Sequence, residues 1–173
     1  MLYGDECDVS LNPLLGRVWH KVGKPYQVIG AGKNHKVYVF GALNSKTGRV
    51  IYRIFRRKRS KEFLEFLHYL MKQYRAWKIY LVLDNFKIHD TKAVREFRKE
   101  NKHRLKIIWL PTYSPYLNLI ERFWRYMKDQ TVRNYFFKDM VKLIQALNSF
   151  FQKYHRKPLV SIIFQERKLC KAG

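Results

Sequence analysis

The feature that most limits the fold of this chain is an apolar run, residues 77–83, that ends directly on an acid, Asp84. The run is short and nearly free of polar residues, which predicts a central strand covered on both faces of a sheet. Apolar residues at helical spacing precede it over about 61–75 and follow it over about 91–101. Alternation of this kind predicts an α/β sheet, and such sheets bind ligands at the carboxyl ends of their strands.

The other elements extend the same pattern into one domain that spans residues 1–173. Strands are expected at 1–9, 36–43, 49–55 and 105–110, and further helices at about 114–128 and 139–154. The helix at 114–128 is expected to bury Leu117, Ile120, Trp124 and Met127. A turn-rich loop is expected at 10–35 and a basic tail at about 156–173. A hairpin meander followed by strand–helix alternation predicts a mixed sheet.

Two distant acids are expected to meet at one end of this sheet. Asp84 ends a buried strand, although an Asp after a strand is equally typical of a turn or a helix cap. Glu121 falls early in a helix, on the side that helical spacing assigns to Asn118 and Arg125. Taken alone, Glu121 is better explained by an ion pair with Arg125. The helix of Glu121, however, directly follows a strand that neighbours the strand of Asp84.

A third acid is expected from the first strand. Alternation along the strand places Asp5 and Cys7 on one face and Glu6 and Asp8 on the other. Asp5 is the first choice because it ends the apolar run, and the alternative is a group of exposed strand-end charges. Carboxylates that converge from strand, strand and helix form the kind of site that magnesium-dependent phosphoryl transfer needs. We expect the three to lie close together, with no fixed cation beside them.

The charge of the chain indicates a polyanionic partner. It has 36 Lys and Arg against 13 Asp and Glu, a formal net charge of +23. Nucleic acid is favoured over an anionic membrane, because the basic residues are spread along a core-forming chain. No apolar run is long enough to span a membrane. Cys7 and Cys170 provide neither a disulfide framework nor a zinc-type spacing.

Three segments together resemble the catalytic domain of DDE transposases, in the superfamily of mariner elements and bacterial insertion sequences. The segments are Asp5-Glu6, Leu83-Asp84-Asn85 with His89, and the block from Tyr113 to Trp124. The block is the most specific, because the family pattern has an aromatic-Ser-Pro turn, then Leu-Asn-Pro-Ile-Glu, then a Trp. Two positions depart from that pattern, Tyr116 and Leu119, and neither is a metal ligand. The spacing of 36 residues between Asp84 and Glu121 is close to that of the family.

The resemblance implies an RNase H-like fold, with a five-stranded mixed sheet flanked by helices. It implies two Mg²⁺ ions, for which Mn²⁺ can substitute, bound by Asp5, Asp84 and Glu121. The family reaction cuts the phosphodiester at the end of the element, and the freed 3′-hydroxyl then attacks target DNA. Possible supporting residues are Asn85, His89 and Asn118. The alternative for His89 is a loop histidine with a structural hydrogen bond.

The resemblance also implies partners and a location. The partner would be double-stranded DNA, both transposon ends and target, bound by a homodimer. The protein is expected to be intracellular and nucleoid-associated, or cytoplasmic in a prokaryote. The residues assigned to DNA contact are Arg53, Arg56, Arg57, Lys58, Arg59, Arg122, Arg125 and Lys128. The alternative for the basic run at 53–61 is a solvated loop that makes no contact with DNA.

Two alternatives to a transposase stay open. They are a metal-dependent RNase H-like nuclease and a catalytically inactive DNA-binding relic. Family members carry an N-terminal helix-turn-helix region that reads the transposon ends, and this chain begins at the catalytic strand. We therefore expect an isolated catalytic domain, one half of a split reading frame, or a truncated relic.

Overall fold

A computed structural model describes residues 1–158 except Val18, His20, residues 25–26, 28–31 and 33–34, and Tyr113. Much of the predicted loop at 10–35, and the predicted tail beyond residue 158, therefore lie outside the described residues. Five strands form one sheet in the order β3-β2-β1-β4-β5. They are β1 (Leu2–Ser10), β2 (Lys36–Asn44), β3 (Val50–Phe55), β4 (Ile79–Leu83) and β5 (Leu105–Trp109).

The sheet is mixed, as predicted from the element order. The first three strands form an antiparallel meander, and β4 and β5 run parallel to each other and to β1. The pairing of β1 with β4 sets Leu2 beside Leu81 and Tyr3 beside Val82. The same register, continued by three residues from Leu2, brings Asp5 level with Asp84.

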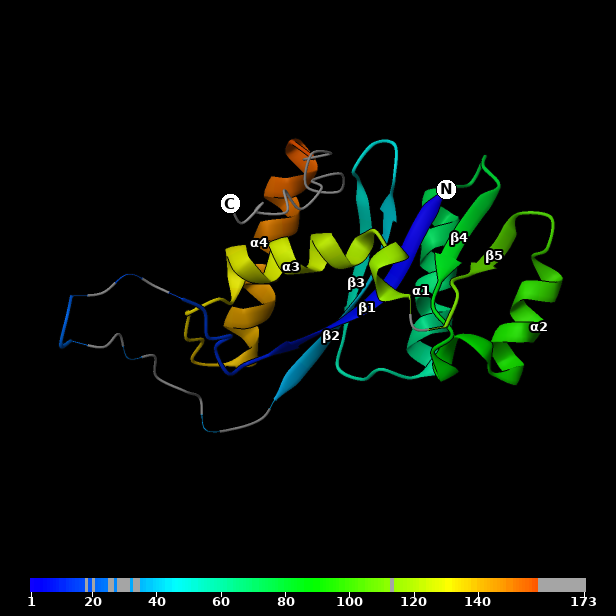
Figure 1. Ribbon diagram of the computed structural model, residues 1–173. Helices are drawn as coiled ribbons and strands as arrows, with labels where there is room; N and C mark the ends of the chain where they lie inside the picture. Colours follow the sequence, from blue (N-terminus) through cyan, green and yellow to red (C-terminus); the bar gives the residue numbers. More distant parts are fainter. Residues whose placement is uncertain are drawn as a thin grey trace.

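Helices cover the sheet on both faces (Figure 1). The helices are α1 (Ser60–Gln73), α2 (Lys92–Glu100), α3 (Ile120–Thr131) and α4 (Met140–Arg156), with short 3₁₀ turns η1 (Lys87–Asp90) and η2 (Pro115–Leu117). One core contains the buried faces of α3 and α4, and the other contains those of α1 and α2. This arrangement confirms the predicted α/β sheet flanked by helices. None of the helices in the described ranges is both long and apolar enough to cross a membrane.

The alternation predicted along β1 is confirmed. Cys7 packs in the core under α3 and α4, whereas Leu2 packs in the core under α1 and α2. Asp5 accordingly faces α3, and Glu6 faces the α1 side of the sheet. The strand therefore presents Asp5 to one layer of the protein, and Glu6 and Asp8 to the other face of the sheet.

The start of α3 differs from the prediction. The helix expected from residue 114 begins only at Ile120, after the 3₁₀ turn η2. Asn118 is not on the polar side with Glu121 but is buried, where its Nδ2 donates a hydrogen bond to the carbonyl of Gly4 at 3.1 Å. This bond draws the chain towards β1 before the helix begins. Leu117, expected in the core, is consequently exposed.

The prediction for the central strand was also partly wrong. The strand begins at Ile79, and Trp77, two residues earlier, is exposed. Leu81, Val82 and Leu83 are buried, but Tyr80, on the face directed away from α1 and α2, is exposed. The strand is therefore fully covered only on the face towards α1 and α2 (Figure 1).

Candidate active site

A cavity of about 280 Å³ lies at the carboxyl ends of β4 and β5. Asp84, directly after β4, and Glu121, the second residue of α3, both line it. Asn85 also lines the cavity and fixes its wall, because its Nδ2 donates to the carbonyl of Leu110 at 2.9 Å. The expected meeting of Asp84 and Glu121 at one end of the sheet is therefore confirmed.

Asp5 lies close enough to this cavity to interact with both acids. Burial, followed by the charges of Glu6, Asp84 and Glu121, raises the pKa of Asp5 from 3.8 to about 7. Burial and the charge of Asp84 likewise raise the pKa of Glu121, although the charge of Arg125 opposes the rise. Glu121 and Arg125 are not among the salt bridges of the described residues. The three acids thus form one electrostatic cluster in which the negative charges oppose one another.

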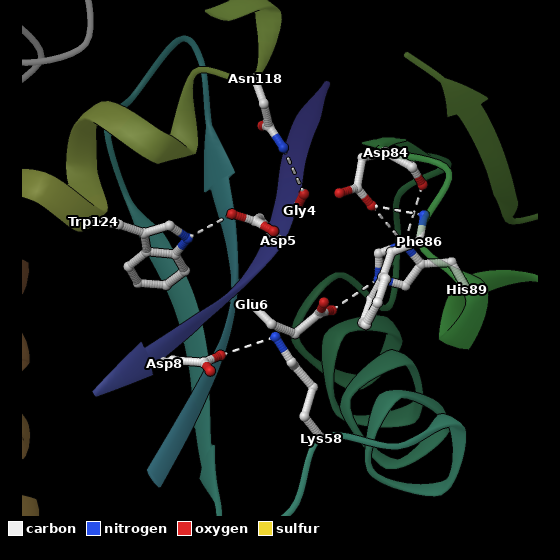
Figure 2. A network of polar contacts seen from close by, with 10 residues as sticks. All are labelled: Gly4, Asp5, Glu6, Asp8, Lys58, Asp84, Phe86, His89, Asn118 and Trp124. Atoms are coloured by element: carbon white, nitrogen blue, oxygen red, sulfur yellow. Dashed lines mark hydrogen bonds and ion pairs between the residues drawn. The ribbon is translucent and has the colours of Figure 1, made fainter. Parts of the chain in front are cut away.

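Asp5 is held from the α3 side. The indole Nε1 of Trp124 donates to Oδ2 of Asp5 at 3.2 Å (Figure 2). Gly41 of β2 is the register partner of Asp5. A Cβ at residue 41 would lie 2.4 Å from the Trp124 ring, so the glycine makes room for the indole. Sequence reasoning assigned Trp124 to the core and to the family motif, and missed both its hydrogen bond and the need for Gly41.

Asp84 is held from the opposite side of the sheet by His89. Nδ1 of His89 lies 3.1 Å from both Oδ1 and the carbonyl oxygen of Asp84, and Nε2 lies 2.9 Å from Oε1 of Glu6 (Figure 2). Each ring nitrogen faces an acceptor, which favours the doubly protonated ring. Although burial opposes the charge, these hydrogen bonds raise the pKa of His89 to about 10.

The histidine overturns the expectation that no fixed cation stands beside the carboxylates. Its hydrogen bond lowers the pKa of Asp84, in contrast to the raised pKa values of the other two acids. The alternative of a structural hydrogen bond is also borne out, because His89 is fully buried. Glu6 was missed as its partner, since nothing in the local sequence links residues 83 positions apart.

The donor chemistry of the cluster fits a hard divalent cation. Asp5, Asp84 and Glu121 supply carboxylate oxygens, which Mg²⁺ prefers. Oδ1 of Asn118, a residue that lines the same cavity, is buried with no hydrogen-bond partner in the described part of the chain. As the side chains are placed, however, no three His, Cys, Asp or Glu residues among those described form a ready cation cage. Bringing the carboxylates together around a cation would require side-chain movements against their mutual repulsion.

The residues assigned to DNA contact fall into two groups. Arg53, Lys58 and Arg59 are engaged in ion pairs, with Glu65, Asp8 and Glu62 respectively. Four of the others lie beside them or on α3: Arg56, Arg57 and Arg125 are exposed, and Arg122 is partly buried.

Lys128 of α3 differs from the rest of these basic residues. It is partly buried and lies beside the thiol of Cys7. The positive charge of Lys128 opposes the effect of burial, which still raises the pKa of that thiol to about 12. Lys128 is therefore directed at β1 as well as at the protein surface.

The chain is similar to known proteins over most of its length. The family described as DDE superfamily endonuclease matches residues 1–144. An insertion element IS630 uncharacterized 39 kDa protein from Shigella sonnei is 35% identical over 153 residues, which is 88% of this chain and 44% of the relative. The chain thus spans less than half the length of that relative.

Solved structures share the fold at low sequence identity. The Mos1 strand transfer complex has a TM-score of 0.70 at 15% identity, over 94% of this chain and 48% of the Mos1 chain. The catalytic domain of Mos1 mariner transposase has a TM-score of 0.62 at 13% identity, over 94% of this chain and 72% of that domain. These likenesses confirm the predicted RNase H-like fold. The family match, which covers residues 1–144, shows that the chain belongs to the DDE superfamily of endonucleases.

Proposed function

We propose that this chain is a transposase catalytic domain that cleaves DNA strands at transposon ends and joins the resulting 3′-hydroxyl to target DNA. The observation that carries the proposal is the placement of Asp84 and Glu121 in one cavity, with the charge of Asp5 coupled to both. The 36 residues between Asp84 and Glu121 place them on separate elements, so the fold itself creates the cluster.

In this proposal Asp5, Asp84 and Glu121 hold two divalent ions, Mg²⁺ or Mn²⁺. The chemistry that such ions supply is activation of a water or hydroxyl nucleophile and stabilisation of the leaving oxygen. Solved structures of the Mos1 catalytic domain with raltegravir and Mn or Mg support the choice of metals. The protein would contribute orientation, since Trp124 fixes Asp5 and His89 fixes Asp84 before any ligand arrives.

The substrate in this proposal is double-stranded DNA. Arg56 and Arg57 are exposed and have no ion pair among the described residues, so they are free to contact phosphates. A homodimer is part of the proposal, because two element ends must reach one target together. The Mos1 paired-end complex with the left transposon end is a relative in fold whose DNA partner is consistent with this view.

Metal-dependent nicking of a supercoiled plasmid tests the proposal. The wild type should nick the plasmid in Mg²⁺ or Mn²⁺ and not in EDTA. Asp84→Asn and Glu121→Gln should abolish nicking with the fold intact, because they remove the charges that hold the metal. Asp8→Asn is the matched control, since Asp8 pairs with Lys58 on the other face and should remain active. Wild-type nicking by a folded Asp84→Asn protein would refute the site.

A joining assay, scored together with nicking and DNA binding, separates the transposase from the nuclease and from the catalytically inactive relic. A labelled duplex with a free 3′-hydroxyl is incubated with the plasmid, and transfer of the label to the plasmid is scored. Joining identifies a transposase, whereas nicking without joining identifies a nuclease. DNA binding with neither reaction would identify a catalytically inactive relic.

A further inference from the structure

A second basic surface lies away from the residues assigned to DNA contact. It is a groove of about 690 Å³ between helix α2 and the outer strand β5, lined at one end by Asp90 and Trp109. Six cationic side chains line it against the single acid Asp90. They are Lys78, Arg95, Arg98, Lys99, Lys102 and Lys106.

The cations of this groove are left largely uncompensated. Asp90 is shared by Arg95, at 3.2 Å, and Arg98, at 3.3 Å. The four lysines have no ion-pair partner within the described ranges. By contrast, Arg53 and Arg59 near α1 and Arg133 after α3 each have an acidic partner of their own. A groove that collects unpaired positive charge has the field that a polyanion needs.

The groove has one side chain held in place by its contacts as well as exposed lysines. Arg98 is only partly exposed and is placed by two contacts, the ion pair with Asp90 and the face of Trp109, whose ring centroid is 5.2 Å from the guanidinium carbon. Trp109 is thus already covered by a cation, so it is not a free platform for stacking a base. A ligand of this groove would be read through its phosphates, which favours a duplex over an unpaired strand.

The groove adjoins the candidate active site. Asp90 follows His89, the residue that holds Asp84, and Trp109 precedes Leu110, which lines the active-site cavity. That cavity, at about 280 Å³, has room for part of a strand and not for a duplex, whose major groove alone is about 12 Å wide. A duplex that presents a phosphodiester to Asp84 must therefore lie on an adjoining surface.

We infer that the groove between α2 and β5 binds the phosphate backbone of a DNA duplex beside the active site. The inference rests on the proposed function for the identity of the polyanion, but the groove itself needs no metal and no catalysis. The simpler explanation is that lysines on an edge strand prevent pairing with other chains. That explanation accounts for Lys106 on β5 but not for the cations on α2 or before β4.

The test compares two triple variants of the 173-residue chain. Lys99→Gln, Lys102→Gln and Lys106→Gln neutralise three exposed groove lysines. The control carries Lys142→Gln, Lys153→Gln and Lys157→Gln, which remove the same charge from exposed positions on or next to α4, in the layer on the other side of the sheet. Binding to a labelled duplex of about 20 base pairs, long enough to contact many phosphates, is measured by anisotropy in EDTA at several salt concentrations.

The groove variant should bind the duplex roughly tenfold or more weakly than the control at low salt. The slope of log affinity against log salt should be less steep by about 0.9 for each lysine that contacts a phosphate, up to about 2.7 for three. Equal affinity and slope for the two variants would overturn the inference. The same comparison is made with a labelled single strand of the same length. If the groove variant loses more affinity for the single strand than for the duplex, the choice of a duplex is overturned.

Failure of this inference is distinguishable from failure of the proposed function. Binding is measured in EDTA, whereas nicking is measured with Mg²⁺ on the wild type. If the wild type nicks DNA and the two triple variants bind equally well, the proposed active site stands and the inference about the groove is refuted. If the wild type does not nick DNA and the groove variant binds weakly, the inference about the groove stands and the proposed enzymatic function is refuted.

Discussion

The indole Nε1 of Trp124 donates a hydrogen bond to Oδ2 of Asp5 at 3.2 Å, across 119 residues of sequence. Trp124 is one helical turn beyond Glu121, so α3 supplies both an acid of the cluster and the group that orients another. The helix thereby couples the position of Asp5 on β1 to that of Glu121. Rigid placement of this kind is what metal-dependent chemistry requires.

Trp124→Phe should lower plasmid nicking without unfolding the protein. The phenyl ring keeps most of the buried contact but removes the N–H that orients Asp5, and small misplacements at a reacting centre cost up to about 100-fold in rate. Nicking rates and thermal melts of the two proteins provide the measurement. Nicking at the wild-type rate would show that the hydrogen bond does not position Asp5.

Gly41→Ala should disturb the same pair from the opposite strand. The new Cβ would lie 2.4 Å from the Trp124 ring, which is inside any normal contact distance. We expect a loss of about 1–3 kcal/mol in the free energy of unfolding, as for other overpacked cores, together with reduced nicking. Urea denaturation checks the stability. A variant as stable as the wild type would mean that the indole has free space to move.

His89 is expected to be the most stability-sensitive residue around the site. His89→Ala leaves the buried carboxylate of Glu6 without its partner, and breaking a buried pair from one side costs about 3–5 kcal/mol. Adding Glu6→Gln should recover part of that loss, because the buried charge is gone. Asp8→Asn, which breaks a partly exposed pair with Lys58, should cost less than about 1 kcal/mol. Equal losses in urea denaturation for His89→Ala and Asp8→Asn would contradict this account.

The raised pKa of Asp5 predicts how stability depends on pH in EDTA. Because the folded protein holds the proton up to about pH 7, against 3.8 ordinarily, the stability from protonated Asp5 is complete below about 3.8. It is lost as the pH rises through 7. From pH 5 to pH 8 the wild type should therefore lose on the order of 1–4 kcal/mol more than Asp5→Asn. Urea denaturation at both pH values measures this, and the contribution of His89 is common to the two proteins. Parallel pH dependences would contradict the prediction.

Much of the fold was predictable from short-range patterns. The run ending at Asp84 and the alternation in β1 are local signals, and both identify the correct faces or ends of the sheet. The start of α3 was not predictable, because Ser114 and Pro115 are ordinary helix-start residues. Between the turn η2 and the helix lies Asn118, which is hydrogen-bonded to Gly4, 114 residues away in the sequence.

The candidate site shows the same division. Its carboxylates follow from the strand end and from the family motif. His89 and Trp124 also belong to segments of that motif, but the hydrogen bonds by which they hold Asp84 and Asp5 do not follow from it. Asp5 is preferred to Glu6 as the ligand from the sequence, and only the fold shows that Glu6 lies against His89. Gly41 had no signal at all in the sequence, since the need for a glycine arises from the Trp124 ring packed over it.

The central claim is that Asp5, Asp84 and Glu121 form one divalent-metal site. Bound metal should relieve the repulsion among them and stabilise the folded chain, because the unfolded chain lacks the site. At a concentration 100-fold above the dissociation constant the gain is about 2.7 kcal/mol. Asp84→Asn should gain much less. The variant should also be less stable than the wild type without metal, since it loses the charged partner of His89.

The most direct test is a thermal melt of the wild type and Asp84→Asn, with and without Mg²⁺, at constant ionic strength. The account predicts a Mg²⁺-dependent rise in the melting temperature of the wild type and little or none in the variant. Absence of a metal-specific rise in the wild type, or an equal rise in both proteins, would show that these acids are ordinary structural charges.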